Sequence, residues 1–161
     1  MSDIQRIAFL GGGNMAEAII KGLLRENSGV ALMIAEISGE RRAYLTTTYP
    51  NIMVVENSAE AAAWGEVVIL AIKPQQAASV LTTLEQAVGS DKLIISIMAG
   101  VRTASIEDAL QSGTRVVRVM PNTPALVGMG ATAICPGKKA TALDLDRVEA
   151  IFAQTGLVVR V

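Results

Sequence analysis

The chain has no histidine among its 161 residues and only one cysteine, Cys135. Without histidine, Ser-His and Cys-His catalysis and the usual zinc ligand sets are excluded, and we expect no metal site. A single cysteine cannot form an intramolecular disulfide, so the cysteine content gives no indication of an oxidising compartment. Because no histidine is present to activate it, Cys135 is interpreted as a buried structural thiol in an apolar strand.

Aromatic side chains and an excess of charge are lacking as well. Phe, Trp and Tyr make up 3% of the chain and the net charge is −1. The sequence therefore offers neither base-stacking platforms nor a basic surface, and we expect no nucleic-acid partner. The apolar runs are too short to span a membrane, and the N-terminal segment does not resemble a signal peptide. The expectation is a soluble cytoplasmic protein with no membrane partner.

The chain is instead rich in aliphatic residues, which alternate between strand and helix patterns. Strands are predicted over residues 6–10, 30–37, 53–55, 66–72, 93–97, 115–120, 128–135 and 157–161. Helices are predicted over residues 14–26, 38–46, 58–63, 75–88, 103–110 and 141–154. Ser38 and Ser58 are the expected N-caps of the second and third helices. The alternation predicts an α/β fold with a doubly wound, Rossmann-like, mostly parallel sheet, helices on both faces, and one domain over 1–161.

The most informative segment joins the first strand to the first helix and contains three consecutive glycines, Gly11 to Gly13. Read as G-x-G-x-x-A, it places Gly11 at the tight turn, Gly13 where a pyrophosphate can approach the backbone, and Ala16 at the close contact between helix and strand. The N-terminus of the helix offers N–H groups to a phosphate. These features predict a dinucleotide-binding loop.

Glu36 ends the second strand, 23 positions after Gly13. A carboxylate at this place accepts hydrogen bonds from ribose hydroxyls and repels a 2′-phosphate, which favours NAD(H). The neighbouring Arg41 and Arg42 offer an alternative, since they could hold a 2′-phosphate with Ser38 as a further donor. Both arginines also fit a solvated helix face. On the last helix, three carboxylates are interpreted as a solvated face rather than a metal site: Asp144, Asp146 and Glu149.

Other strands of the predicted sheet end at the same edge, where ligands of such folds bind. Lys73 follows a buried strand and could donate to a ribose, a nicotinamide amide or an anionic substrate. Asn122 and Thr123 lie between two prolines, which stiffen their loop and suit it to holding a ligand. Asn57 precedes the third helix and is either a turn residue or part of the site.

Four segments in this order and spacing resemble the pyrroline-5-carboxylate reductase family: Phe9–Met15, Ala71–Pro74, Ala99–Val101 and Arg118–Pro124. That family reduces the cyclic imine 1-pyrroline-5-carboxylate to proline with NADPH or NADH, in the last step of proline synthesis. The resemblance implies a small cyclic imine as substrate and favours NADP(H), whereas Glu36 favours NAD(H). The cofactor preference therefore stays open at this point.

The resemblance and the loop pattern together give a set of expected cofactor-binding residues: Leu10, Gly11, Gly12, Gly13, Asn14, Met15, Glu36, Ser38, Asn57, Ala71, Ile72, Lys73, Pro74, Ala99, Gly100, Asn122 and Pro124. No residue is assigned as the catalyst. Lys73, Asn122 and Thr123 are expected near the nicotinamide and the substrate entrance.

Members of the family continue into a helical domain that makes a dimer or higher homo-oligomer and supplies the substrate-binding loop, and this chain stops at Val161. We therefore expect a cofactor-binding half that is mainly monomeric and binds cofactor with little or no turnover. Two alternatives remain. One is the cofactor domain of a β-hydroxyacid or 6-phosphogluconate-like dehydrogenase, and the other is a non-catalytic NAD(P)-sensing module.

Overall fold

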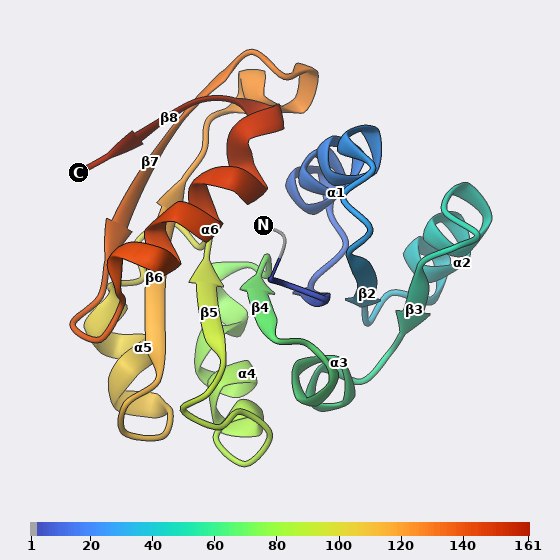
Figure 1. Ribbon diagram of the computed structural model, residues 1–161. Coiled ribbons are helices and arrows are strands. Elements are labelled where there is room, and N and C mark those ends of the chain that lie inside the picture. The colour runs from blue at the N-terminus through green and yellow to red at the C-terminus, as the bar shows by residue number, and fades with distance from the viewer. Residues whose placement is uncertain (1–2) are drawn as a thin grey trace.

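Short aliphatic strands alternate with helices along residues 3–161, the part of the chain that this computed structural model describes (Figure 1). The strands are β1 (Arg6–Leu10), β2 (Ala31–Ala35), β3 (Met53–Val55), β4 (Val67–Leu70), β5 (Leu93–Ser96), β6 (Arg115–Met120), β7 (Gly130–Pro136) and β8 (Gly156–Arg160). The α-helices are α1 (Asn14–Glu26), α2 (Gly39–Thr48), α3 (Ser58–Trp64), α4 (Ala77–Leu84), α5 (Thr103–Ala109) and α6 (Ala142–Phe152). Short 3-10 turns are η1 (Pro74–Gln76), η2 (Thr123–Val127) and η3 (Ala153–Thr155).

The strands form one sheet in the order β3-β2-β1-β4-β5-β6-β7-β8. Strands β1 to β6 are parallel, with Leu10 opposite both Ala35 and Leu70, whereas β7 is antiparallel to β6 and β8 is parallel to β7. This is the predicted doubly wound, Rossmann-like and mostly parallel sheet. The order of the strands reverses between β1 and β4, so the C-terminal ends of these two strands form the switch point of the fold.

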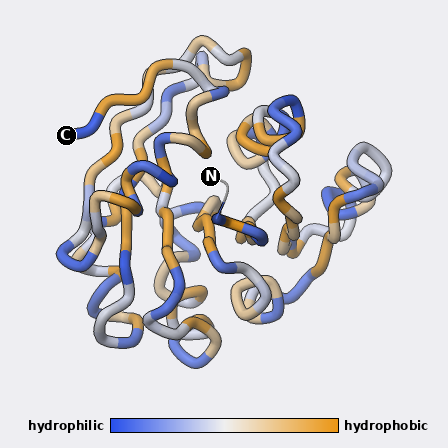
Figure 2. The backbone as a smooth tube through the Cα atoms, in the orientation of Figure 1, coloured by the Kyte–Doolittle hydropathy of each residue, from blue (hydrophilic) through white to orange (hydrophobic). Residues whose placement is uncertain are grey.

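The central strands β1, β4 and β5 are buried on both faces, because successive side chains point to opposite sides and helices cover each side. In β1, Ile7 and Phe9 pack with α1, α2 and α6, whereas Ala8 and Leu10 pack with α3, α4 and α5. All four side chains are fully buried. Figure 2 shows the hydrophobic residues running along the central strands. The near-continuous apolar runs of the sequence therefore correspond to the middle layer of the fold.

Five of the six α-helices begin or end at residues other than the sequence predicts, and the N-cap of α3 and the length of α4 are the informative differences. Ser38 caps α2, accepting from the Arg41 N–H at 3.2 Å, but α3 is capped by Asn57 rather than by Ser58. The Asn57 carboxamide oxygen accepts from two backbone N–H groups at 2.8 and 3.1 Å. The helix expected over 75–88 opens with the turn η1 and continues as α4 only to Leu84. Near the end of α4, the hydroxyls of Thr82 and Thr83 donate hydrogen bonds to the backbone carbonyls four residues earlier. Such bonds weaken a helix.

The interpretation of Cys135 as a buried thiol is wrong, because its side chain is exposed. Its neighbour Ile134 faces α6 and is fully buried, so Cys135 points to the opposite face of β7. The same face of β8 carries exposed apolar side chains, with Leu157 at 65% and Val159 at 45% of full exposure. The outer end of the sheet is therefore apolar and exposed on one side.

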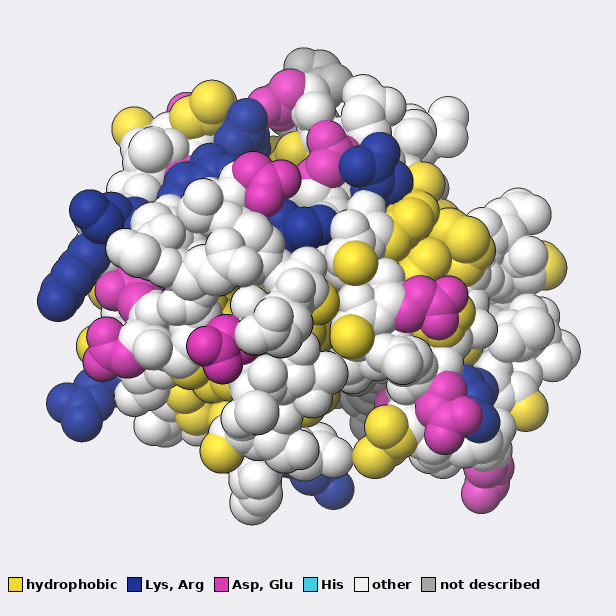
Figure 3. All heavy atoms as spheres, turned by 90° about the horizontal axis from the view of Figure 1, so that it is seen from below, with side chains coloured by type: hydrophobic (Ala, Val, Ile, Leu, Met, Phe, Trp, Pro, Cys, Tyr) yellow, Lys and Arg dark blue, Asp and Glu magenta, His cyan; other side chains and the backbone are white. Residues whose placement is uncertain are grey.

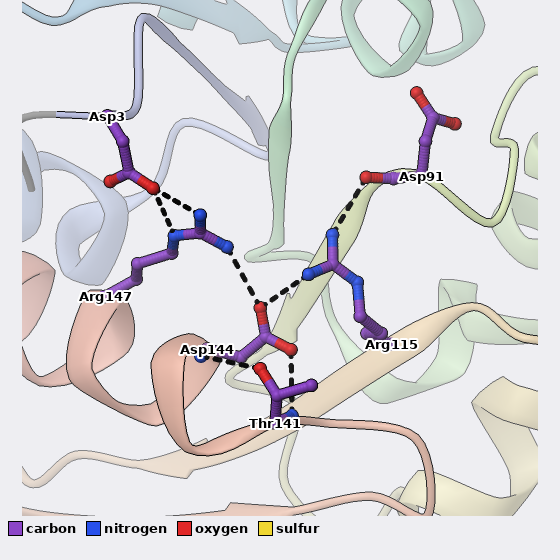
Figure 4. Close-up of polar contacts among 6 residues, drawn as sticks. All are labelled: Asp3, Asp91, Arg115, Thr141, Asp144 and Arg147. Carbon is purple, nitrogen blue, oxygen red and sulfur yellow. Dashed lines mark hydrogen bonds and ion pairs between the residues drawn. The ribbon is translucent and has the colours of Figure 1, made fainter.

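Asp144 is fully buried, contrary to the prediction of a solvated face on α6. Its Oδ1 atom accepts from Arg115 Nη1 at 2.7 Å and from Arg147 Nη1 at 3.3 Å, and its Oδ2 atom accepts from the Thr141 N–H at 2.9 Å (Figure 4). Arg147 also pairs with Asp3. This cluster ties α6 to β6 and to the segment before β1. The prediction failed because the burial of Asp144 depends on its contact with Arg115, 29 residues away in the sequence, and Asp144 is also the N3 residue of a capping box.

The other two carboxylates of α6, Asp146 and Glu149, are exposed and pair with Arg160 of β8. The Asp144 cluster lies where the strands begin, and Figure 3 shows basic and acidic side chains mixed on this face of the molecule. The charges are therefore compensated locally at this edge.

Along residues 3–161, no helix has both the length and the apolar character needed to cross a bilayer.

Candidate functional site

A cleft of about 650 Å³ opens at the C-terminal edge of the sheet, over the switch point. It receives residues from the ends of five strands: Gly11–Ala16 after β1, Ala35–Ile37 at β2, Ala71–Pro74 after β4, Ile97–Ala99 after β5, and Met120–Pro121 at β6. The rest of its lining consists of Ser58, Gln76 and Val80. Its volume lies within the usual range for small-molecule and cofactor sites.

The three glycines of the loop are required for different reasons. Gly11 has φ +101°, and a Cβ atom there would lie 2.3 Å from the Ala71 carbonyl oxygen of the neighbouring strand end. A Cβ atom at Gly12 would lie 2.6 Å from the Leu45 Cδ1 atom. At Gly13, a Cβ atom would meet nothing within 4 Å among the described residues, so this side of the loop faces open space. The first two glycines thus serve packing, and the third keeps the cleft free.

The helix α1 starts directly at the cleft. Its N-cap residue is Gly13, in extended conformation at φ −79°, which has no side chain to cap the first N–H groups. Ala16, the last residue of the motif, is 1% exposed against the sheet. The N-terminus of a helix carries free donors and a partial positive charge, which suits an anionic group such as a phosphate.

Glu36 lies at the rim of the cleft, and its carboxylate joins two parts of the site. The Oε1 atom accepts from the Gly12 N–H at 3.1 Å, and the Oε2 atom accepts from the Ser38 N–H at 2.9 Å. Because a carboxylate has about four lone-pair positions, it retains acceptor capacity for a ligand. The neighbouring Ile37 also lines the cleft and is 66% exposed, so an apolar surface stands beside the carboxylate.

Arg41 and Arg42 are both engaged with protein groups and are not part of the cleft lining. The Arg41 Nε atom donates to the Gly12 carbonyl at 2.6 Å. The Arg42 Nη1 atom donates to the carbonyls of Glu36 and Ile37 at 2.8 and 2.9 Å. They are therefore not the simple solvated helix face that the sequence allows. Both fix the backbone around the cleft.

Behind the loop, the buried carboxylate of Glu17 of α1 accepts three hydrogen bonds and forms an ion pair with a fourth group. Its carboxylate receives Arg41 Nη2 at 2.8 Å, Tyr44 Oη at 2.9 Å and Tyr49 Oη at 2.6 Å, and Lys21 lies 3.5 Å away. Burial acts to raise the pKa of Glu17, but the hydrogen bonds from the tyrosines and Arg41 outweigh it and leave the pKa lowered. Burial and the bond to Glu17 raise the pKa of Tyr49.

The cleft brings together most of the residues expected at a cofactor site: Gly11, Gly12, Gly13, Asn14, Met15, Glu36, Ala71, Ile72, Lys73, Pro74 and Ala99. Outside its lining lie Leu10, Ser38, Asn57, Gly100, Asn122, Thr123 and Pro124. Leu10 is fully buried in β1. The Asn122 carboxamide oxygen accepts from the Ala131 N–H at 2.9 Å, which fixes the start of β7.

Sequence reasoning placed residues 36–38 at the adenosine ribose, Ile37 included, but missed several other residues of the lining: Ala35, Ser58, Gln76, Val80, Ile97, Met98, Met120 and Pro121. Half of these residues, Ile97, Met98, Met120 and Pro121, lie at or directly after the end of a predicted strand. Their position in the pattern was the available signal, because every residue at the C-terminal end of a parallel strand approaches the same edge. Their side chains are mostly apolar, so residue type gave no separate indication of a site.

The strand order and the cleft at the switch point define a Rossmann-like α/β domain with a site at the position where ligands of this fold class bind. The sequence family described as NADP oxidoreductase, coenzyme F420-dependent, matches residues 6–100, and the chain belongs to this family. The matched part runs from β1 through β5 and includes the glycine loop and Glu36.

Within that class, the chain is similar to pyrroline-5-carboxylate reductases, which confirms the resemblance inferred from its motifs. It is 40% identical to the enzyme of Methanosarcina acetivorans over 98% of this chain and 58% of that protein. It is 37% identical to the Mycobacterium tuberculosis enzyme over 97% of this chain and 55% of that protein. The chain thus spans little more than half the length of these curated relatives, which are named as enzymes.

Solved structures agree with this grouping. A pyrroline-5-carboxylate reductase from Coxiella burnetii superposes with a TM-score of 0.91 at 30% identity, covering 99% of this chain and 59% of that one. The Plasmodium falciparum enzyme, solved with NADP bound, superposes with a TM-score of 0.83 at 29% identity. The match covers 100% of this chain and 58% of that one. Prephenate dehydrogenase of Aquifex aeolicus superposes with a TM-score of 0.83 at 16% identity, covering 99% of this chain and 60% of that one. At this low identity, the match shows a shared fold only.

Proposed function

We propose that this chain binds a nicotinamide dinucleotide and forms the cofactor-binding part of a reductase that converts 1-pyrroline-5-carboxylate to proline. The observation that carries the proposal is the cleft over the switch point, where the glycine loop, Glu36 and the Ala71–Pro74 segment meet. The similarity to pyrroline-5-carboxylate reductases along 97–98% of the chain supports the choice of substrate.

The residues of the cleft fit a dinucleotide. The open space at Gly13 and the uncapped start of α1 suit the pyrophosphate, because N–H groups there have no side-chain competitor. Glu36 suits the adenosine ribose, and the exposed Ile37 suits the flat face of the adenine. Lys73 and Ala99, at the ends of β4 and β5, suit the nicotinamide half. We propose no direct contact for Leu10, which is buried in β1.

The chemistry of the proposed reaction makes few demands on this chain. When bound, the nicotinamide supplies the hydride that reduces the imine carbon. A protonated imine is already electrophilic, so a strong acid from the protein is not required. The residues of the cleft bind and orient the cofactor, so that its reactive face is presented at the open end. This division of labour is compatible with a chain that contains no histidine.

We further propose that NAD(H) is preferred over NADP(H). The Glu36 carboxylate at the cleft would repel a 2′-phosphate. The two arginines that offered the alternative donate to backbone carbonyls instead, Arg41 to Gly12 and Arg42 to Glu36 and Ile37. The Ser38 hydroxyl is likewise used, as the cap of α2. These contacts support NAD(H) even though one similar structure, from Plasmodium falciparum, contains NADP.

The test is a fluorescence titration of the purified chain with NADH and, separately, with NADPH. We expect saturable binding of both, with a lower Kd for NADH. The variant Glu36→Ala removes the repulsion and should narrow the difference between the two Kd values. Absence of saturable binding of either cofactor would overturn the proposal, and a lower Kd for NADPH would overturn the preference.

Addition of 1-pyrroline-5-carboxylate to the chain loaded with NADH tests the catalytic part of the proposal. We expect little or no oxidation of NADH, because the chain spans only 58% or less of the similar enzymes. We propose that the substrate-binding and dimer-forming groups lie beyond these residues. Substantial turnover by residues 1–161 alone would contradict this division.

A further inference from the structure

We propose that Arg41 is a positioning residue, which holds the glycine loop in the shape that receives the pyrophosphate without contacting the cofactor itself. The inference rests on the proposed binding of a dinucleotide in the cleft. It is carried by the contacts that Arg41 makes with Gly12 on one side and with Glu17 on the other. It differs from the role that the sequence suggested, which was a ligand for a 2′-phosphate.

The Gly12 peptide is held at both of its polar groups. Its carbonyl oxygen accepts from Arg41 Nε at 2.6 Å, and its N–H donates to Glu36 Oε1 at 3.1 Å. The space beside this residue is filled, since a Cβ atom there would lie 2.6 Å from Leu45 and 3.0 Å from Ile34. The direction of this peptide sets the position of the next residue, Gly13, whose open side faces the cleft.

Arg41 in turn has a fixed orientation. Its Nη2 atom donates to Glu17 Oε1 at 2.8 Å, and its guanidinium lies 4.6 Å from the centre of the Tyr44 ring. Its side chain is 27% exposed, whereas that of Glu17 is 8% exposed. A guanidinium is a planar group with several donors in a fixed geometry, so two contacts are enough to orient it. The arginine therefore connects a buried carboxylate to the loop.

Glu17 belongs to the helix that the loop opens. Its backbone N–H donates to the Gly13 carbonyl at 3.0 Å, which is the first bond of α1. The other carboxylate oxygen of Glu17 accepts from the hydroxyls of Tyr44 and Tyr49. The cluster thus joins α2 to the beginning of α1. Within the cluster, Arg41 of α2 is the described residue whose side chain forms a hydrogen bond with Gly12. Loss of Arg41 would free the Gly12 carbonyl while leaving the rest of the cleft lining in place.

The experiment compares Arg41→Met with a matched control, Lys21→Met. Both variants remove a cation beside the Glu17 carboxylate, but Lys21 is 58% exposed and, among the described residues, its ammonium pairs with Glu17 and not with the loop. For Arg41→Met, we expect the Kd values of NADH and NADPH to rise by the same factor, roughly ten- to a hundredfold, because one charge-assisted hydrogen bond is lost. For Lys21→Met, we expect a change of less than about twofold.

A second comparison separates positioning from general stability. Circular dichroism identifies a temperature at which all variants are folded, and all Kd values are measured there. Because Glu17 acts on the loop through Arg41, Glu17→Gln should weaken binding less than Arg41→Met. The double variant should bind no more weakly than Arg41→Met alone. Two purely structural effects at separate sites would instead add.

The possible results are distinguishable. If the wild-type chain binds neither cofactor, the proposed function fails. If the wild-type chain binds and Arg41→Met binds equally well, the positioning role is overturned while the proposed function stands. If Arg41→Met loses affinity for NADPH only, Arg41 is a ligand of the 2′-phosphate and the inference is also overturned.

Discussion

Gly11 and Gly13 of the glycine loop meet different physical constraints, in line with the separate roles that the motif predicts for them. Gly11 combines a positive φ with a close approach to Ala71, whereas Gly13 has an extended backbone and open space where a side chain would point. Alanine therefore meets a physical obstacle at the first position but not at the second. Stability and ligand binding should respond differently to the two substitutions.

We predict that Gly11→Ala lowers the free energy of unfolding by at least about 2 kcal/mol, because of backbone strain and the 2.3 Å contact with the Ala71 oxygen. Gly13→Ala should change stability by less than about 1 kcal/mol, yet raise the Kd for NADH, since its methyl group occupies the space proposed for the pyrophosphate. Chemical denaturation and cofactor titration of both variants measure the two effects. Unchanged NADH affinity in Gly13→Ala would contradict the placement of the pyrophosphate.

The Glu17 carboxylate makes stability depend on pH. Its pKa in the folded chain is below the ordinary value of 4.5, so the unfolded chain binds more protons in this range. The resulting stabilisation is fully present above the unfolded pKa and is lost as the pH falls through the folded pKa. We predict that the advantage of the wild-type chain over Glu17→Gln is largest near neutral pH and shrinks below about pH 4.5.

Urea denaturation of both proteins at a series of pH values measures this difference. Asp3, whose pKa is lowered by its hydrogen bond with Arg147, titrates in both proteins and therefore cancels. A difference that stays constant down to the most acidic pH would show that Glu17 contributes through packing rather than through its charge.

Local spacing was sufficient to predict where single residues of the candidate site lie in the fold. The place of Glu36 at the end of β2 and of the glycines before α1 follows from the pattern of the sequence alone. The contacts of Glu36 with the Gly12 N–H and of Arg41 with the Gly12 carbonyl span 24 and 29 residues. Such long-range pairs depend on how α2 packs on α1, which no local pattern contains.

At the scale of elements, the apolar runs predicted the strands, but not the direction of β7. The loop between β6 and β7 contains two prolines and forms only the turn η2, so the chain returns antiparallel to β6 rather than crossing over through a long helix. The face of α6 was also predicted wrongly at Asp144. The helical pattern predicts that Asp144 is solvated, because aspartate is a polar residue. Its burial becomes visible only in the packing of α6 against Arg115.

We predict that Asp144→Ala lowers the free energy of unfolding by roughly 2 to 4 kcal/mol, because two arginines lose a buried partner and α6 loses its capping box. Asp146→Ala on the same helix is the control and should have little effect, since its side chain is 62% exposed. Neither variant should alter the Kd for NADH. A large loss of cofactor affinity in a folded Asp144→Ala protein would contradict the separation of this cluster from the cleft.

At the scale of the whole molecule, the sheet ends in an open edge. β8 is the last strand of the order, and its exposed apolar residues Leu157 and Val159 stand on a face opposite α6. Edge strands with apolar side chains favour association between molecules, and charges on them oppose it. A chain that is mainly monomeric should therefore still show weak association at high concentration.

We predict that Val159→Lys abolishes this weak association without changing the Kd for NADH, because the edge lies outside the cleft lining. Sedimentation velocity over a wide range of protein concentration provides the measurement. A tight dimer at all concentrations in the wild-type chain would contradict the expectation of a mainly monomeric protein.

The two hydrogen bonds that fix the Gly12 N–H and carbonyl also have a consequence for the rate of cofactor binding. Because both of its polar groups are bonded within the protein, the loop is ordered as the chain folds and not when a ligand arrives. Binding then carries little further loss of conformational entropy, and the encounter needs no slow rearrangement of the backbone. The observed association rate should rise linearly with cofactor concentration, with no plateau that would mark a preceding conformational step.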